Sequence, residues 1–244
     1  MKITSTRASA NHAIKALIYG ESGIGKTYLA STLNGKTLVI SAESGLLSLA
    51  NFDIDVIDLS VDDTGKPVTK SMKIDRIMEV YKFLLKPESL AKYDNVFIDS
   101  LTEIGQNVSE KFKLEFPEKK DALKLWGEYN DKMRSIIKAF RDLPKYNVVM
   151  TALVKFDKDD TNCRNALINI QGSIGEHLPQ FFDEVFFYGL SVKEDSATSR
   201  MLYTSKSDRY IAKDRSGRLK PMEDPDLSGI FLKIKKETKN EQSK

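Results

Sequence analysis

The run from Gly20 to Thr27 carries the strongest chemical signal in this sequence. It reads Gly-Glu-Ser-Gly-Ile-Gly-Lys-Thr and fits the pattern G-x-x-x-x-G-K-[ST] in full. Glycines let the backbone curl until its N–H groups face one point, and a helix that follows adds the positive end of its dipole. Lys26 can then reach the outer phosphates, and Thr27 can offer its hydroxyl to Mg²⁺. The run predicts a phosphate-binding loop, with ATP and Mg²⁺ as cofactors.

The nucleotide is expected to contact this loop along its whole length. The predicted contacts come from Gly20, Glu21, Ser22, Gly23, Ile24, Gly25, Lys26, Thr27 and Tyr28. The alternative is a glycine-rich turn that holds a lysine by chance. An apolar strand pattern before the loop and a helix pattern after it favour the phosphate-binding interpretation.

A carboxylate for the Mg²⁺ shell is expected at the end of another buried strand. Asp99 ends the apolar run at 95–99, Asn-Val-Phe-Ile-Asp, which matches the Walker B pattern. Alone this is weak evidence, because half-buried strands often end in a polar residue. Beside the phosphate-binding loop it predicts that Thr27 and Asp99 hold the metal.

Hydrolysis also needs a group that accepts a proton from the attacking water. Many ATPases with such a loop carry a glutamate directly after the Walker B acid, but here that position is Ser100. Glu43 ends the strand that follows the loop, and the carboxyl ends of parallel strands share one edge of a sheet. We therefore predict Glu43 as the catalytic base, with a capping or loop glutamate as the alternative. Thr151, at the end of the run 148–152, is a candidate sensor of the γ-phosphate.

These residues need an α/β frame, and the rest of the sequence predicts one. Strands are expected at 13–19, 37–42, 54–59, 95–99 and 148–153, and later at 185–188, 201–204 and 210–212. Helices are expected from Lys26, over 74–85 and over 123–140, with a loop at 60–72. The alternation through residue 153 predicts a mostly parallel sheet flanked by helices, with a strand-rich, antiparallel C-terminal end.

Composition excludes several classes of protein. Hydrophobic residues make up 41% of the 244 residues, which is too many for a disordered chain. No apolar run approaches the roughly 20 residues of a membrane helix, so we expect no membrane partner and a cytoplasmic location. Cys163 is the only cysteine, and with His12 and His177 it argues against a disulfide or a zinc site. The expected parts are a polar lead at 1–12, one ATPase domain at 13–232 and a lysine-rich tail at 233–244.

Taken together, the motifs resemble those of the RecA/RadA branch of P-loop ATPases. The run Ser-Ala-Glu-Ser at 41–44 is similar to the end of the strand that carries the catalytic glutamate in that branch. The run at 171–185 contains Gln-Gly-Ser-Ile-Gly, His-Leu-Pro and Phe-Asp-Glu-Val. It is similar to the passage that leaves the second DNA-binding loop. The resemblance implies a RecA-like P-loop NTPase core and makes Gln171 a second candidate sensor.

A later motif resembles one that acts between neighbouring subunits in the same branch. The run Lys-Asp-Arg-Ser-Gly at 213–217 resembles the RadA motif K-N-R-F-G, with Asp for Asn and Ser for Phe. In that family the lysine and the arginine reach the ATP of the neighbouring subunit. The resemblance therefore implies a catalytic role in trans for Lys213 and Arg215, and a homo-oligomer. It leaves open whether that oligomer is a ring or a filament.

Over 13–232 the sequence is most similar to small phage-encoded ATPases of the AAA type, some of which are single-strand annealing recombinases of the Sak type. This implies a DNA-stimulated ATP hydrolase that acts on single-stranded DNA in recombination or replication, within the host cytoplasm. Other copies of the chain and a single-strand DNA-binding protein are the expected protein partners. The rival interpretations are an AAA+ remodeller or loader and a nucleotide-binding adaptor without turnover. A nucleoside kinase is disfavoured, because Asp208-Arg209-Tyr210 lies too late in the chain.

Two basic segments are candidates for DNA contact. In the first, over 101–120, lysines alternate with Phe112 and Phe116; the second runs from Lys155 to Arg164. Lysines beside aromatic rings suit contact with the nucleic acid backbone and stacking on bases, whereas a solvated helix face is the alternative. The net charge of +3 does not by itself indicate nucleic acid. The candidate contacts are Lys111, Lys113, Lys155, Lys158 and Arg164.

Overall fold

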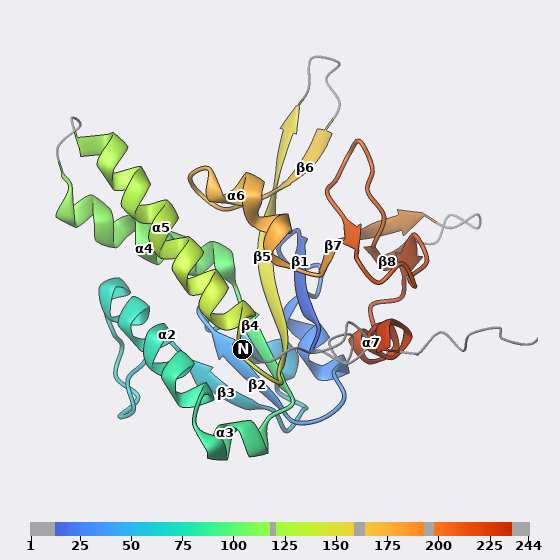
Figure 1. Cartoon of the computed structure of the whole chain (residues 1–244), viewed down its shortest axis with the longest axis horizontal. Coiled ribbons are helices and arrows are strands. Elements are labelled where there is room, and N and C mark those ends of the chain that lie inside the picture. Colours follow the sequence, from blue (N-terminus) through green and yellow to red (C-terminus); the bar gives the residue numbers. More distant parts are fainter. Residues whose placement is uncertain (1–12, 118–120, 159–163, 193–197, 236–244) are drawn as a thin grey trace, which may run out of the picture.

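The computed structural model describes residues 13–117, 121–158, 164–192 and 198–235 (Figure 1). Its strands are β1 (Lys15–Gly20), β2 (Thr37–Ser41), β3 (Asp55–Asp58), β4 (Asn95–Asp99), β5 (Asn147–Lys158), β6 (Arg164–Ile168), β7 (Glu184–Val192), β8 (Thr198–Tyr203), β9 (Lys213–Asp214) and β10 (Met222–Glu223). Its helices are the 3-10 helices η1 (Thr27–Thr32), η2 (Leu46–Leu49) and η4 (Leu178–Phe181), and the α-helices α2 (Lys70–Leu84), α3 (Pro87–Lys92), α4 (Leu101–Glu115), α5 (Ala122–Arg141), α6 (Ile174–His177) and α7 (Leu227–Lys235).

One mixed sheet runs through the molecule in the order β10-β8-β7-β1-β5-β4-β2-β3. The pairs among β7, β1, β5, β4, β2 and β3 are parallel, whereas β8 and β10 pair antiparallel at the other end. Two further strands, β6 and β9, pair antiparallel with β5 and β7. This is the expected RecA-like P-loop NTPase core, so the predicted fold class is confirmed, including its antiparallel C-terminal end.

Each central strand contributes side chains to two cores, one on each face of the sheet. On β1, Leu17 and Tyr19 belong to one core and Ala16 and Ile18 to the other, because successive side chains of a strand point to opposite faces. The first core also contains residues of α2, α4 and α5, and the second contains residues of η1 and α7. Figure 1 shows the same division of helices between the two faces. Burial on both faces explains why the strands read as unbroken apolar runs.

The helix expected from Lys26 is present as a short 3-10 helix. It is the six-residue 3-10 helix η1, which ends before Gly35. Tyr, Ser and Thr are weak helix formers, and here the hydroxyls of Ser31 and Thr32 bond to the carbonyls of Tyr28 and Leu29, three residues back. The helix dipole therefore adds less to the phosphate site than the sequence suggested.

Two other predictions of secondary structure near the C-terminus are wrong. Residues 210–212 form an isolated bridge at Tyr210 instead of a strand, because the hydroxyl of Tyr19 occupies both the N–H and the carbonyl of Ile211 at 2.8 Å. The tail expected from residue 233 begins inside α7. Leu227, Ile230 and Phe231 are buried at helical spacing, a signal the sequence analysis missed.

β5 and β6 form a β-hairpin that was not predicted from the sequence. β5 continues to Lys158 and pairs with β6, so the basic segment that begins at Lys155 starts as a strand. The helix α2 also begins earlier than expected, inside the predicted loop, where Thr69 caps it by accepting a bond from the Met72 N–H. Within the described parts of the chain, no helix is both long and apolar enough to cross a membrane.

Candidate nucleotide-binding and active site

The phosphate-binding loop joins the end of β1 to η1 and needs its glycines for different reasons. Gly23 and Gly25 have φ of 76° and 108°, in the left-handed region that favours glycine. A Cβ on Gly20 would lie 2.4 Å from the carbonyl oxygen of Tyr188, so β7 leaves no room for a side chain there. The loop backbone is therefore curled as a phosphate cradle requires.

Lys26 is folded back across this loop. Its Nζ donates to the carbonyls of Gly20 at 3.1 Å and Glu21 at 2.8 Å, and the side chain is 7% exposed. Burial lowers the pKa of Lys26, and the carboxylates of Asp99 and Glu43 oppose this effect. A phosphate in the cradle would replace the two carbonyls as partner and stabilise the charged ammonium group.

Asp99 is held from both sides by threonine hydroxyls. Thr27 Oγ1 donates to Asp99 Oδ2, and Thr151 Oγ1 donates to Asp99 Oδ1, each at 2.5 Å. The strand order explains the arrangement, because β5 with Thr151 lies between β1 and β4. Asp99 is 5% exposed, so its carboxylate has a fixed orientation beside the phosphate-binding loop.

The oxygens of Thr27 and Asp99 fit Mg²⁺. A hydroxyl and a carboxylate are the hard oxygen ligands that this ion prefers, and proteins usually supply only one or two of its ligands beside phosphates and waters. Consistent with such a site, the described residues contain no cluster of three or more His, Cys, Asp or Glu that could bind a metal by itself. Bound there, Mg²⁺ would supply positive charge to the phosphate oxygens.

Glu43 lies in a cleft of about 490 Å³ next to the loop, which Ser22 also lines. Its Oε1 accepts a short hydrogen bond from the hydroxyl of Ser100, the residue that stands where other ATPases carry their glutamate. β2 and β4 are neighbours in the sheet, so their carboxyl ends bring Glu43 and Ser100 together. The sequence analysis placed Glu43 at this edge, and the geometry agrees.

Three further side chains line the same cleft and were missed. Lys73 comes from α2, and Glu103 and Gln106 come from the first turns of α4. Glu103 and Gln106 are three residues apart and therefore lie on one face of α4, which begins directly after Asp99 and Ser100. That spacing was visible in the sequence, whereas nothing in it marked Lys73.

The two candidate sensors differ in their surroundings. Thr151 is fully buried, and its hydroxyl is occupied by Asp99 and, at 3.4 Å, by the carbonyl of Ile98. Gln171 is exposed, follows β6 and is not among the residues that line the cleft. The structure thus brings Thr151 to Asp99, the predicted metal ligand, and leaves Gln171 outside the cleft.

Lys213 and Arg215 lie at the opposite edge of the sheet from the phosphate-binding loop. β9 pairs with Glu184 and Val185 at the start of β7, whereas the loop follows the last residue of β1. Lys213 Nζ donates to the Pro179 carbonyl at 2.9 Å, and Arg215 pairs with Asp183 at 2.8 Å. Neither residue serves the site of its own chain.

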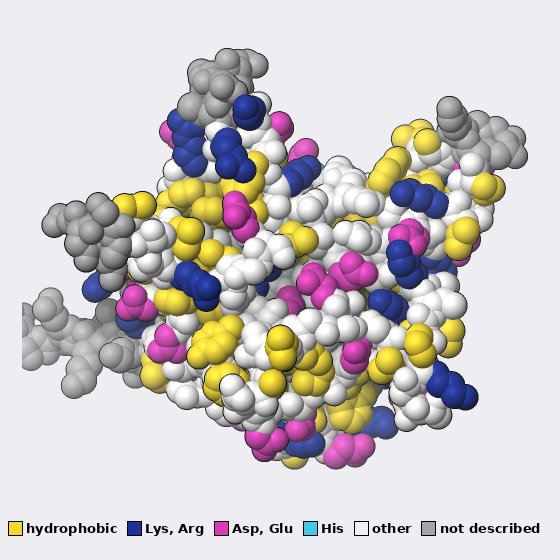
Figure 2. Space-filling model, turned by 180° about the vertical axis from the view of Figure 1, so that it is seen from behind, with side chains coloured by type: hydrophobic (Ala, Val, Ile, Leu, Met, Phe, Trp, Pro, Cys, Tyr) yellow, Lys and Arg dark blue, Asp and Glu magenta, His cyan; other side chains and the backbone are white. Residues whose placement is uncertain are grey.

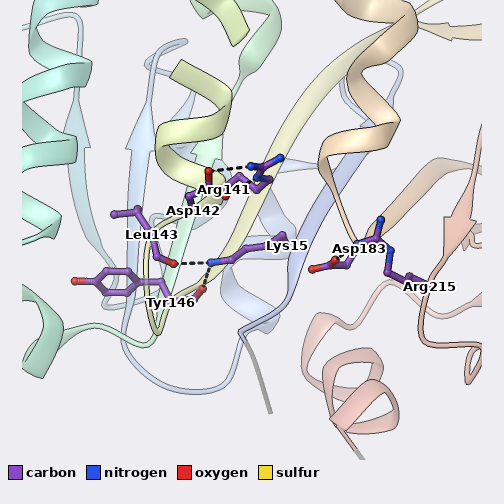
Figure 3. A network of polar contacts seen from close by, with 7 residues as sticks. All are labelled: Lys15, Arg141, Asp142, Leu143, Tyr146, Asp183 and Arg215. Atoms are coloured by element: carbon purple, nitrogen blue, oxygen red, sulfur yellow. Dashed lines mark hydrogen bonds and ion pairs between the residues drawn. The ribbon is translucent and has the colours of Figure 1, made fainter. Parts of the chain in front are cut away.

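A cavity of about 600 Å³, lined by both charged and apolar side chains, occupies this amino-terminal edge. Figure 3 shows Arg141 paired with Asp142 and Arg215 close to Asp183, with Lys15 between the two pairs. The Nζ of Lys15 donates to the carbonyls of Leu143 at 2.9 Å and Tyr146 at 2.7 Å, and burial lowers the pKa of Lys15 to about 8.

The candidate DNA contacts fall on two projections. Lys155, Lys158 and Arg164 are exposed on the β5–β6 hairpin, which stands at the top of Figure 2 and carries a group of Lys and Arg side chains. The guanidinium of Arg164 lies over the ring of Phe156, 4.1 Å from its centroid.

The second projection is the end of α4, with Lys111 and Lys113. The half-buried rings of Phe112 and Phe116 are stacked there, 6.3 Å apart. Two further lysines of this segment, at 119 and 120, were noted in the sequence. Lys119 and Lys120 lie outside the described residues, as does Cys163.

Comparison with known families identifies the class of this protein. A family model described as an AAA domain (AAA_24) matches residues 12–216, so the chain belongs to that family. A search of curated proteins gave no match. Among solved structures, a prototypical ATPase from the type III secretion system of pathogenic bacteria is similar, with 14% identity and a TM-score of 0.45. The match covers 73% of this chain and 52% of that ATPase, so this chain spans about half of the ATPase's length.

Proposed function

We propose that this AAA-family protein hydrolyses ATP at the edge formed by the phosphate-binding loop, β2 and β4. The observation that carries the proposal is the array in which Thr27 and Thr151 hold Asp99, with Glu43 in the open cleft beside it. A site that only bound nucleotide would have no need of a carboxylate placed where the γ-phosphate and a water would meet.

In this mechanism the protein groups divide the work. Lys26 exchanges its two carbonyl partners for phosphate oxygens and balances their charge. Glu43 accepts the proton of the attacking water, and its hydrogen bond from Ser100 orients the carboxylate toward the cleft. Thr151 keeps Asp99 in the orientation that leaves Thr27 beside it.

Phosphate release measured with and without Mg²⁺ tests this proposal. The wild-type protein should turn over ATP, and Asp99→Asn should still bind nucleotide but lose Mg²⁺-dependent turnover. Wild-type rates in Asp99→Asn would show that Asp99 does not hold the metal. An absence of turnover in the wild-type protein, alone and with DNA, would favour the adaptor function.

We propose further that the protein acts on single-stranded DNA, as a Sak-type annealing or recombinase-like ATPase. The β5–β6 hairpin supports this. It presents three cations and a Phe156 ring already stacked by Arg164. Cations suit the phosphate backbone, and an exposed ring stacks on bases of any sequence. DNA should therefore stimulate hydrolysis, and the affinity should fall as salt rises.

A charge-matched pair of variants tests the hairpin. Lys155→Ala/Lys158→Ala should weaken binding of a labelled oligonucleotide and reduce the salt dependence. Lys82→Ala/Lys86→Ala removes the same charge from exposed positions at the end of α2 and should bind like the wild-type protein. Equal loss in both double variants would mean that only net charge matters. A lack of any DNA effect on turnover at low salt would favour the remodeller or loader.

We propose that the active form is a homo-oligomer in which Lys213 and Arg215 complete the ATP site of the next copy. Their position at the edge opposite the phosphate-binding loop supports this, because head-to-tail packing brings unlike edges together. Both side chains would then leave their present partners, Pro179 and Asp183, for phosphate oxygens. A single-strand DNA-binding protein remains the proposed second partner.

A further inference from the structure

The β7–β8 hairpin extends past the end of β1 and stands beside the phosphate-binding loop. The last residue of β1, Gly20, is in register with Tyr188 on β7, and Tyr188 pairs with Leu202 on β8. The next pair on the same face, two residues farther along, is Leu190 with Arg200. Tyr188 and Leu202 belong to the core that η1 covers, so Arg200 lies on that face at the level of the loop.

The guanidinium of Arg200 lies close to Gly25 of the loop. A Cβ on Gly25 would lie 3.2 Å from Arg200 Nη1 and 3.4 Å from the hydroxyl oxygen of Tyr188. The two side chains are hydrogen-bonded to each other; burial raises the pKa of Tyr188, and the bond and charge of Arg200 oppose that rise. Arg200, which is hydrogen-bonded to Tyr188, therefore lies beside Gly25, the residue directly before Lys26.

This arginine is available to a ligand. Arg200 is exposed, and among the described residues no carboxylate forms an ion pair with it. A guanidinium offers a planar fork of donors that matches two phosphate oxygens at once, which a lysine cannot do. An exposed arginine beside a phosphate-binding loop thus has the chemistry of a phosphate contact.

We propose that Arg200 binds the nucleotide of its own chain, at the phosphates nearer the nucleoside, and that Tyr188 positions it. This inference rests on the proposed nucleotide site. Asp99 and Glu43 lie across β5 from β1, on the side that the γ-phosphate would face, whereas β7 and Arg200 lie on the other side of β1. The phosphates within reach of Arg200 are those that ATP and ADP share.

Isothermal titration with ATP and with ADP tests the proposal. Arg200→Ala should weaken both affinities about tenfold or more, the range for a charge-assisted hydrogen bond. Arg200→Lys should recover part of the loss, and the turnover at saturating ATP should stay within about threefold, since the contact acts on binding and not on the step that needs a base. Arg134→Ala is the control: it removes an exposed arginine of α5, paired with Asp131, and should bind both nucleotides normally.

The positioning role of Tyr188 has its own readout. Tyr188→Phe should weaken nucleotide binding less than Arg200→Ala, and the double variant should bind no more weakly than Arg200→Ala alone. Additive losses would show that Tyr188 does not act through Arg200.

Three results would overturn the inference. They are an Arg200→Ala variant that binds like Arg134→Ala, a loss confined to ATP, or a loss of turnover with unchanged affinity. Binding that Lys26→Ala abolishes and Arg200→Ala leaves intact would refute the role of Arg200 alone. A wild-type protein that bound neither nucleotide would refute the nucleotide site as well.

Discussion

Two lysines at opposite ends of the same strand show how differently the two edges of the sheet are built. Lys15 begins β1 and is half-buried, whereas Lys26 follows the loop at its end and is buried; each donates to two backbone carbonyls. In both, burial lowers the pKa of the ammonium group. The local chemistry is nearly the same, but the neighbours differ.

At the amino edge two ion pairs are already formed. Arg141 and Arg215 are paired with Asp142 and Asp183, and Lys15 ties together the loop before β5. At the carboxyl edge the functional groups surround an open cleft, and Asp99 is held by hydroxyls that can also contact a metal. A ligand at the amino edge must break ion pairs, whereas a phosphate at the carboxyl edge replaces the two backbone carbonyls that Lys26 contacts.

The largest expected effect comes from exchanging the two lysines for alanine in separate variants. Lys26→Ala should lower ATP affinity at least about a hundredfold, since losing one partner of a buried charged pair costs about 3–5 kcal/mol. Lys15→Ala should leave ATP affinity within about twofold but lower the melting temperature by several degrees, because two carbonyls lose their donor. Calorimetric titration and thermal melts of both variants measure this. Equal losses of ATP affinity in the two variants would contradict the assignment of the nucleotide site to the carboxyl edge.

The next effect concerns the two carboxylates of the cleft. Glu43→Gln should bind ATP normally and hydrolyse it about 10²–10⁴-fold more slowly, because an amide cannot accept the proton of water. Glu103→Gln changes the other cleft carboxylate in the same way and should slow turnover less than about tenfold, a bound set by the same magnitude. Single-turnover rates distinguish them. A reversed order would make Glu103 the base.

A mixing experiment addresses the amino edge. Lys26→Ala and Lys213→Ala/Arg215→Ala should each be inactive alone, yet their mixture should regain part of the ATPase activity. Mixed oligomers contain junctions in which one copy supplies an intact loop and the next supplies Lys213 and Arg215. A dead mixture, with co-assembly confirmed by light scattering, would contradict the role in trans. Normal activity of the double variant alone would remove any catalytic role.

The smallest effect is a pH dependence of stability at the amino edge. Glu184 is 1% exposed, and burial, reinforced by Asp214, raises its pKa from 4.5 to about 8. Between those values the folded protein keeps a proton that the unfolded chain has lost, so this group lowers stability as pH rises toward 8. Glu184→Gln should therefore raise the melting temperature at pH 8 by a few degrees and leave it unchanged at pH 4.

Thermal melts at both pH values measure this, with Glu128→Gln as a control. Glu128 is an exposed glutamate of α5, so its substitution should shift neither melt. A shift in Glu184→Gln that is equal at the two pH values would show that Glu184 does not titrate in this range.

Most of the candidate site at the carboxyl edge could be predicted from the sequence because it depends on chain order. The loop glycines, Asp99 and Glu43 each follow a recognisable apolar strand, and parallel topology then brings the strand ends together. Lys73 and Arg200 depend instead on tertiary register, which no local pattern records. Arg200 reaches the loop only because β7 and β8 continue past the end of β1, where Arg200 pairs with Leu190 two residues beyond Tyr188.

Other secondary-structure predictions were wrong where side chains form the hydrogen bonds that backbone groups would otherwise make. Tyr19 takes the bonds that would have made 210–212 a strand, and the hydroxyls of Ser31 and Thr32 compete with the helix after the loop. Propensity and periodicity describe what the backbone prefers by itself. They cannot predict a hydrogen bond between residues 192 positions apart in the sequence, such as that from the Tyr19 hydroxyl to the Ile211 carbonyl.

The long strand β5 joins the candidate site to the projecting hairpin. One strand carries Thr151, whose hydroxyl touches Asp99, and seven residues farther on carries Lys158 at the hairpin. At about 3.3 Å per residue the two lie roughly 23 Å apart, with neither glycine nor proline between them to act as a hinge. In the proposed function, β5 would connect DNA binding at the hairpin with the hydroxyl that holds Asp99.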